Sequence, residues 1–314
     1  MALGGKGDEH FQTVQHDDAY LTRVWPRAQG RILLPRPLLR RPNRLTCSAM
    51  IQIFPFIKRK PSVAVIRLQG MIASGSNPGR LNDASLAPLI EMAFRRGRPK
   101  AVALVINSPG GSPVQSALIA ARIRRLAEEL KIPVHAFVED LAASGGYWLA
   151  TAADDIHVDG NSIVGSIGVI SAGFGLHELL NRYGVERRVY TSGKSKSQLD
   201  PFRPENPDDI ARLRALQDQV HKNFIAQVKS RRGAKLADED LFTGEFWDGT
   251  RAVELGLADT LGQMAPTLEE RYGEKLRYRV YGQRRPLLSR LGLSLMGDAM
   301  VLAEERALYA RFGL

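Results

Sequence analysis

The sequence predicts an α/β fold in which strands and helices alternate along the chain. Apolar, β-branched runs of strand length occur at residues 62–68 and 101–106. Each run is followed by a stretch, 83–96 and 113–130, in which apolar residues recur at helical spacing. With 44% hydrophobic and 25% charged residues, the chain of 314 residues has the composition of a globular protein. The alternation is typical of a largely parallel sheet covered by helices.

Local signals place the individual elements. The first helix begins at Asp83, and the turn Asn107-Ser108-Pro109-Gly110-Gly111-Ser112 ends the second strand. A long helix follows Asn206, with Pro207 at its first position. The other elements that we expect, in order of type, are strands at 132–138, 155–158, 167–170 and 185–190, and helices at 147–153, 176–183, 207–231 and near Ala252.

The positive charge of the chain is concentrated at its beginning. Of the net charge of +11, the first 60 residues carry +7, because they hold 11 of the 44 Lys and Arg but only 4 of the 33 Asp and Glu. Residues 1–49 lack any periodicity, so we expect a disordered basic leader. We favour translation from Met50 over a basic arm for an anionic surface. The modest charge of the remaining chain gives no reason to expect a nucleic-acid partner.

The rest of the chain divides into a globular domain at 50–283 and a basic amphipathic segment at 284–314. For the latter we favour a subunit contact over a helix on a membrane surface, which leaves peripheral membrane contact open. No stretch has the ~20 apolar residues of a membrane span, and no secretion signal follows Met1. We therefore expect a cytoplasmic protein. The single cysteine, Cys47, excludes an internal disulfide framework and a multi-cysteine zinc site.

Four separated segments of small residues stand out as a constellation. They are Asn107-Ser108-Pro109-Gly110-Gly111-Ser112, Ala143-Ser144-Gly145-Gly146-Tyr147, Gly165-Ser166-Ile167-Gly168-Val169-Ile170 and Ser192-Gly193-Lys194-Ser195-Lys196. In their order and spacing the chain resembles peptidase family S49, the signal peptide peptidase A and SohB-like serine proteases. The resemblance extends to Phe242-Thr243-Gly244 and Gly256-Leu257-Ala258-Asp259, which are similar to the family's C-terminal signature.

The resemblance implies a Clp protease/crotonase-like fold, a homo-oligomer and hydrolysis of peptide substrates, such as signal-peptide remnants, by a Ser–Lys dyad. It places the nucleophile at Ser144 and the general base at Lys196, the last residue of the Gly-x-x-Lys pattern. It assigns Ser166 to orienting the lysine, and Gly110 and Gly111 to the oxyanion hole. It implies no cofactor and no metal.

The chemistry of the residues is compatible with these roles. A serine hydroxyl is a weak nucleophile that needs an adjacent base. Lysine, whose ordinary pKa is ~10.4, becomes a base when burial in an apolar cleft lowers that pKa. No acidic residue lies at 190–199 to oppose this. Lys194 would share a face with Lys196 in an extended segment, so only the family's spacing distinguishes the two.

Other mechanisms remain open at this point. A Ser-His-Asp triad could use His135 or His157 with Asp154 or Asp155. The Gly-x-Ser-x-Gly elbow is not matched, because position 142 is alanine. A crotonase-like acyl-CoA enzyme and a catalytically silent peptide-binding scaffold are the alternative functions. Labelling of an activated serine by a fluorophosphonate would distinguish both from a peptidase.

Overall fold

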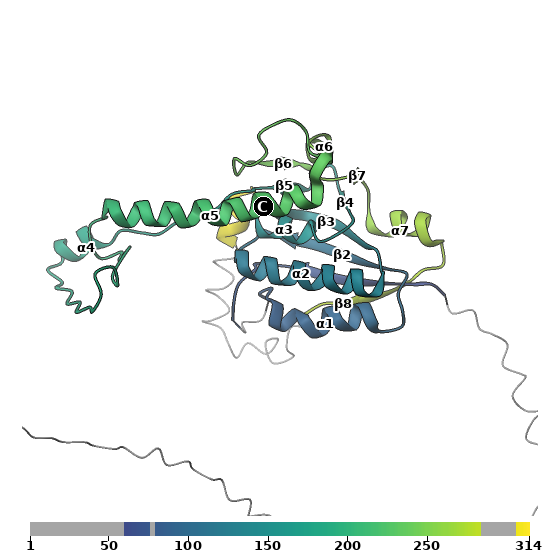
Figure 1. Cartoon of the computed structure of the whole chain (residues 1–314), viewed down its shortest axis with the longest axis horizontal. Coiled ribbons are helices and arrows are strands. Elements are labelled where there is room, and N and C mark those ends of the chain that lie inside the picture. The colour runs from purple at the N-terminus through teal and green to yellow at the C-terminus, as the bar shows by residue number, and fades with distance from the viewer. Residues whose placement is uncertain (1–59, 76–78, 284–305) are drawn as a thin grey trace, which may run out of the picture. The chain divides into compact units, whose positions relative to one another are not determined.

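The predicted strands lie side by side in one sheet. The computed structural model describes residues 60–75, 79–283 and 306–314, and within them the strand order is β6-β5-β3-β2-β1-β8, with β4 paired to β3 and β7 paired to β4 (Figure 1). Every pairing is parallel except that of β5 with β6. The prediction of an α/β fold with alternating strands and helices is confirmed.

The central strands are apolar along their whole length because both faces of the sheet are covered. β1 (Ser62–Gln69) is buried in all but two positions, and β2 (Ala101–Ser108) is buried throughout. Parallel strands covered on both sides show this continuous apolar pattern and not an alternation.

The next strand, β3 (Val134–Ala143), has two neighbours in succession on its other side. Its first half pairs with β4 (Asp155–Val158), and its second half pairs with β5 (Ile163–Gly165). β5 is followed on the far side by the antiparallel β6 (Phe246–Asp248). The sheet therefore forks at β3, and the ends of β3 and β5 come to lie next to each other.

Three helices cover one face of the sheet. They are α1 (Asp83–Arg95), α2 (Pro113–Leu130) and α3 (Gly145–Ala150). Ser112 caps α2 by accepting a hydrogen bond from the Gln115 N–H, with Pro113 in the first turn. These helices bury the main apolar core, which includes Ile90, Leu126 and Tyr147.

The opposite face is covered by α7 (Met264–Tyr272), which the sequence pattern did not indicate. Its Leu268 is fully buried in a second core with Val65, Val105 and Phe137. β8 (Arg277–Tyr281) then pairs with β1 at the edge of the sheet. The remaining elements are the 3₁₀ turn Gly233–Lys235, α6 (Gly249–Glu254) and β7 (Thr260–Leu261).

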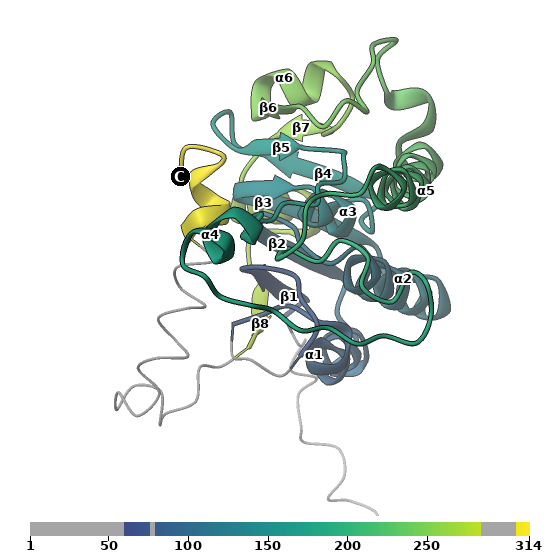
Figure 2. The same ribbon diagram turned by 90° about the vertical axis from the view of Figure 1, so that its left-hand side faces the viewer.

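The longest helix, α5 (Pro207–Arg232), crosses the α3 side of the sheet and extends beyond it (Figures 1 and 2). Near its C-terminal end, Phe224 is buried against Trp148 of α3, with 5.0 Å between the ring centroids. The segment 170–206, which contains α4 (His177–Arg182), lies beyond its N-terminal end and has no buried residue. We call residues 170–206 the arm.

Two predicted strands are wrong. The strand expected at 167–170 lies instead at Ile163–Gly165, because Ser166 has a φ of +53° that takes the chain out of the ladder. The strand expected at 185–190 has no regular structure. Its charged residues Glu186, Arg187 and Arg188 are exposed, and no described strand lies alongside to pair with it.

Two other predictions concern residues that are not described. The leader at 1–49 and positions 284–305 of the C-terminal segment lie outside the described residues, so these predictions stay untested. None of the described helices combines the length and apolar character needed to cross a membrane.

The attachment of α5 to the sheet depends on a buried arginine. Arg232 is 4% exposed; its guanidinium donates to the Gly256 carbonyl at 2.7 and 2.9 Å and to Asp259 at 2.7 Å. Asp259 in turn accepts from the Ile156 N–H of β4. Burial raises the pKa of Asp259, but the hydrogen bonds from Arg232, Lys235 and Ile156 outweigh burial and hold it below its usual value.

We expect Arg232→Leu to lower the free energy of unfolding by about 3–5 kcal/mol, because it leaves a buried carboxylate and carbonyl without their donor. Lys235→Leu removes the other cation on Asp259, but Lys235 is half exposed and should cost less than ~1 kcal/mol. Urea denaturation of both variants measures the difference. Equal losses would show that burial of Arg232 is unimportant.

Candidate active site

Ser144 occupies a strained turn between β3 and α3. Its backbone has φ +52° and ψ −121°, a region that non-glycine residues rarely adopt. Its N–H donates to the Gly165 carbonyl of β5 at 2.8 Å, and its carbonyl accepts from the Trp148 N–H of α3 at 3.0 Å. These two bonds hold the residue between strand and helix. Its side chain makes no capping hydrogen bond and is half buried, which leaves the hydroxyl available.

The turn after β2 packs directly against Ser144. A Cβ atom on Gly110 would lie 2.7 Å from the Gly145 nitrogen, 2.8 Å from the Ala143 oxygen and 2.8 Å from the Ser144 Cβ. Gly110 also has a φ of +95°. Only glycine allows this approach, so the predicted proximity of the Gly110–Gly111 turn to Ser144 is present in the structure.

Two backbone N–H groups without a partner occur in the residues that line the space beside Ser144. Gly110 donates its N–H to Ser108 Oγ at 3.2 Å and so is already used. The N–H groups of Gly111 and Gly145 donate to no other group in the described part of the chain. Gly111 is exposed and Gly145 begins α3, where the first N–H groups of a helix lack intrahelical partners. Gly145 is a donor that the sequence analysis missed, although its place directly after the nucleophile could have indicated it.

An apolar hollow of about 20 Å³ opens beside Ser144. Its wall combines the turn after β2, the segment after Ser166 and α5. The lining residues are Gly111, Pro113, Ser144, Gly145, Trp148, Gly168, Val169, Val220 and Phe224. The contribution of α5 could not be read from the sequence, because Val220 and Phe224 look like ordinary core residues of a helix.

Ser166 lies next to this site. It follows Gly165 at the end of β5, is half buried, and has its N–H bonded to the Glu245 carbonyl at 2.6 Å. Like Ser144 it has a positive φ, +53°. The fork in the sheet thus brings Ser144 and Ser166 to adjacent strand ends, which the strand expected at 167–170 would not have done.

Lys196 is not brought to Ser144 within this chain. It lies on the arm, is exposed, and its side chain has no partner among the described residues. Lys194 is exposed on the same segment. Figure 1 shows the arm beyond the N-terminal end of α5, away from α3. The structure therefore does not join the two members of the predicted dyad in one chain.

The histidine-based triad is wrong. His135 precedes Ser144 by nine residues along the extended β3, which at ~3.3 Å per residue separates them by roughly 25–30 Å. His157, on the neighbouring β4, pairs with Phe137 of β3 and therefore also lies far from the Ser144 end of β3. Both histidines instead face α7 on the other side of the sheet.

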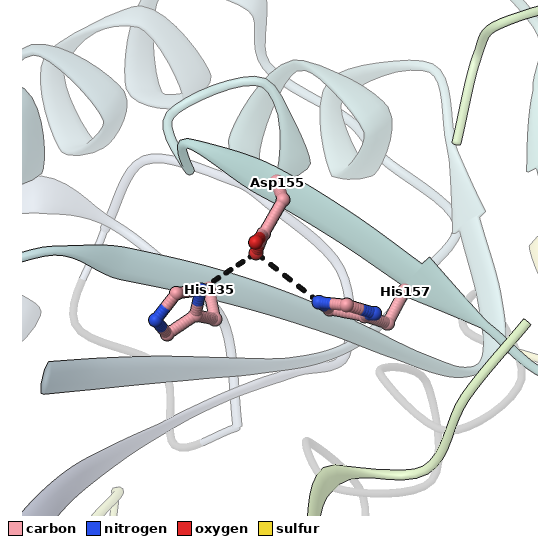
Figure 3. A group of neighbouring side chains, drawn as sticks. All are labelled: His135, Asp155 and His157. Carbon is pink, nitrogen blue, oxygen red and sulfur yellow. Dashed lines mark hydrogen bonds and ion pairs between the residues drawn. The ribbon is translucent and has the colours of Figure 1, made fainter. Parts of the chain in front are cut away.

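These histidines form a closed hydrogen-bond network with Asp155 (Figure 3). Because an ionised carboxylate only accepts, His135 donates through Nδ1 at 2.6 Å and His157 through Nε2 at 3.2 Å. The remaining ring nitrogens then accept from the hydroxyls of Tyr272 and Thr260, both at 2.7 Å.

The three side chains of this network could also hold a metal ion, since their ligand atoms lie within 4.8 Å of one another. A cation is already present, however, because the guanidinium of Arg271 is bonded to Asp155 and lies 3.1 Å from His135 Nδ1. Burial raises the pKa of Asp155, but hydrogen bonds from His135, His157 and Arg271 outweigh burial and hold it far below its usual value. Because hydrogen-bond donors already surround the Asp155 carboxylate, we interpret the three residues as a structural network that attaches α7 to the sheet and not as a metal site.

If the network is structural, a chelator such as EDTA should leave the melting temperature unchanged. Asp155→Ala should lower the free energy of unfolding by about 1–3 kcal/mol for each of the buried ring N–H groups of His135 and His157, which lose their acceptor. Because the pKa of Asp155 is lowered in the folded state, the Asp155 carboxylate contributes to the free energy of unfolding at pH values above its ordinary pKa of ~3.9. This contribution is lost as the pH falls through the pKa of the folded state. Thermal melts with and without chelator test this. A melting temperature that falls when the chelator is added would instead support a metal site at these three residues.

Gly110→Ala should destabilise the protein by about 1–3 kcal/mol more than Gly273→Ala, because only the former places a methyl group against backbone. The two glycines have nearly equal φ values, +95° and +98°, and nothing lies within 4 Å of a Cβ on Gly273. The matched pair therefore separates the clash from the conformational cost. The denaturant midpoints of both variants give the comparison. Equal shifts would mean that the Gly110 turn can move to accommodate the methyl group without a further loss of stability.

Comparison with known proteins shows which family the chain resembles. The model of peptidase family S49 matches residues 127–274, which include Ser144, Ser166 and Lys196. A Synechocystis protein described as putative protease slr0021 is 32% identical over 267 residues, which cover 80% of this chain and 92% of that protein. A variant of the 1510-N membrane-bound stomatin-specific protease has a solved structure with a TM-score of 0.45 and 18% identity, covering 76% of this chain and 99% of that one.

Higher identity occurs with part of a longer protein. A Brucella melitensis protein described as Na(+)/H(+) antiporter NhaA is 49% identical over 271 residues, which are 80% of this chain but 37% of that protein. The chain thus spans little more than a third of the first relatives that it matches. The family resemblance is confirmed, and the sheet has the alternating α/β architecture that was predicted with it. The chain belongs to peptidase family S49.

Proposed function

We propose that this chain is a serine peptidase that hydrolyses peptide bonds with Ser144 as the nucleophile. The observation that supports this most strongly is the strained turn at Ser144, whose half-buried side chain lines the same hollow as Gly111 and Gly145, two glycines with unused backbone N–H groups. A strained nucleophile beside such donors is an arrangement suited to acyl transfer.

In the proposed reaction, Ser144 Oγ attacks the carbonyl carbon of the substrate while its proton passes to the base. The C–N bond then breaks, the amine leaves with that proton, and water hydrolyses the acyl-enzyme. The negative charge that develops on the carbonyl oxygen is stabilised by the N–H groups of Gly111 and Gly145. Gly110 contributes by its close approach, which places the Gly111 donor beside the serine. We thus keep the oxyanion role for the Gly110–Gly111 turn and add Gly145 to it.

The base in this proposal is Lys196, assisted by Ser166. An exposed lysine is protonated at neutral pH and cannot accept a proton. Lys196 must therefore enter a drier environment, beside a Ser144 hydroxyl, before it can act. Because its own Ser144 is not within reach in this structure, we assign the base to the arm of a second copy of the chain.

The arm supports this assignment. It keeps a defined shape through the ion pair of Arg187 with Asp200 and the packing of Arg187 over the Phe202 ring, 4.6 Å from its centroid. It nevertheless has no core of its own, and its Phe174 and Tyr190 are 86% and 90% exposed. Large exposed aromatic side chains mark protein contacts. A hollow of about 600 Å³ between residues 171–175 and the start of α5 offers room for such a contact.

The substrate in this proposal is a peptide whose residue at the cleaved bond is small and apolar. The hollow beside Ser144 is narrow, about 20 Å³, and its wall includes Trp148, Val169 and Phe224. A charged side chain would lose its hydration there without gaining a partner. Peptides such as signal-peptide remnants satisfy this requirement.

Complementation between two inactive variants tests both the nucleophile and the origin of the base. Ser144→Ala should abolish peptide hydrolysis, because no acyl-enzyme can form. Lys196→Met should lose at least ~10²-fold in kcat, the lower end for general-base catalysis. Mixed oligomers of the two variants should regain about a quarter of wild-type activity, because one site in four then combines an intact serine with an intact lysine from its neighbour. Hydrolysis of a library of apolar peptides gives the measurement.

Lys194→Met is the matched control, since it removes the neighbouring exposed lysine, and it should remain within a small factor of wild type. No recovery on mixing would mean that the base acts within one chain. Activity of Ser144→Ala near that of wild type would reject the nucleophile. A wild-type protein that binds peptides without turnover or fluorophosphonate labelling would instead be a silent scaffold.

A further inference from the structure

The last residues of the chain fold back onto the strands that carry the proposed active site. Residues 306–310 form a helical turn, and the chain then ends beside β3 (Figure 2). Within 306–314 only Phe312 is buried, at 9% exposure. This segment, which we call the C-terminal clasp, packs on the face of the sheet opposite α3.

Phe312 packs at the base of the two strained serines. It forms a small core with Leu141 and Ala143 of β3, and Ala143 directly precedes Ser144. It also contacts Phe246 edge-to-face, with 5.1 Å between the ring centroids. Phe246 is paired with Gly165, which directly precedes Ser166. One side chain thus supports both strand ends.

Tyr309 fixes the third part of the site. Its hydroxyl donates to the Asn107 carbonyl at 3.0 Å, at the first residue of the turn that contains Gly110 and Gly111. The Asn107 side chain is itself held by Asp140, with 2.6 Å between Nδ2 and Oδ2. The clasp therefore contacts the strand ends from which the three loops of the site begin: β3 and Asn107 directly, and β5 through Phe246. None of these contacts is to a reacting group.

We propose that the C-terminal clasp is a positioning element for the catalytic centre, with Phe312 and Tyr309 as its positioning residues. The physical reason is strain. The positive φ values of Ser144 and Ser166 are unfavourable for non-glycine residues and persist only where the surroundings enforce them. Without the clasp, the ends of β3 and β5 can relax and carry the hydroxyl away from the Gly111 and Gly145 donors. This inference rests on the proposed function.

The direct test is hydrogen exchange in the full chain. The N–H groups of Ser144 and Ser166 are bonded to the Gly165 and Glu245 carbonyls. In Phe312→Ala both should exchange at least ~10-fold faster than in the wild type, because the bonds at these strand ends open more often. The Arg277 N–H, bonded to the Pro61 carbonyl at the far edge of the sheet, should be unchanged. This readout does not depend on any peptidase activity.

Kinetics provide the second readout. Phe312→Ala should lower kcat by about 10-fold and leave KM within about twofold, since a small misplacement of the nucleophile slows the chemical step. Tyr309→Phe, which removes only the hydroxyl, should act in the same direction. Phe312→Leu should recover most of the loss. Leu314→Ala is the matched control in the same segment, because Leu314 is 53% exposed.

Unchanged exchange at Ser144 and Ser166 in Phe312→Ala would overturn the proposal. So would a rise in KM at constant kcat, which would place the clasp in substrate binding. An equal acceleration at Arg277 would show a loss of global stability only. If the wild type hydrolyses no peptide while the exchange result is as expected, the proposed function fails and the positioning role stands.

Discussion

The geometry of the candidate active site depends on the contact between two backbone turns. The Gly110 turn after β2 and the Ser144 turn after β3 approach so closely that even a methyl group on Gly110 would lie within 3 Å of the backbone. This contact requires a glycine with positive φ on one side and a strained serine on the other. It also requires the ends of β2 and β3 to stop at the same level, which their parallel pairing ensures.

The rest of the fold supports this contact from two directions. On the α3 side, α5 packs on Trp148 and is fastened through the buried Arg232. Arg231 of α5 also donates to the Thr151 and Ala153 carbonyls, which closes the end of α3 opposite Ser144. On the far side, α7 and the C-terminal clasp cover the sheet. Strain at the site is thus balanced by packing on both faces.

The arm shows the opposite physical character. It has charged residues and exposed aromatic residues but no buried side chain, so it gains little from folding against its own chain. Under the proposed function, the serine and the oxyanion donors lie on the sheet and the lysine on the arm. The proposal therefore makes activity depend on assembly, because the base comes from a second copy of the chain.

Much of the fold and part of the site could be predicted from the sequence. The alternation of apolar runs predicted the sheet, and helix caps such as Ser112 and Asn206 located helices to within a residue or two. The strand-to-helix junction at Ser144 could be predicted from local pattern, whereas Ser166 and the Gly110 turn were indicated by the resemblance to the family. The tertiary structure alone decided what depends on distant contacts: the strand at 163–165, the use of Gly145 as a donor, the placement of His135 and His157 beneath α7, and the packing of Phe312 behind Ala143. Local periodicity contains no information on such contacts, because they join segments separated by up to about half of the chain.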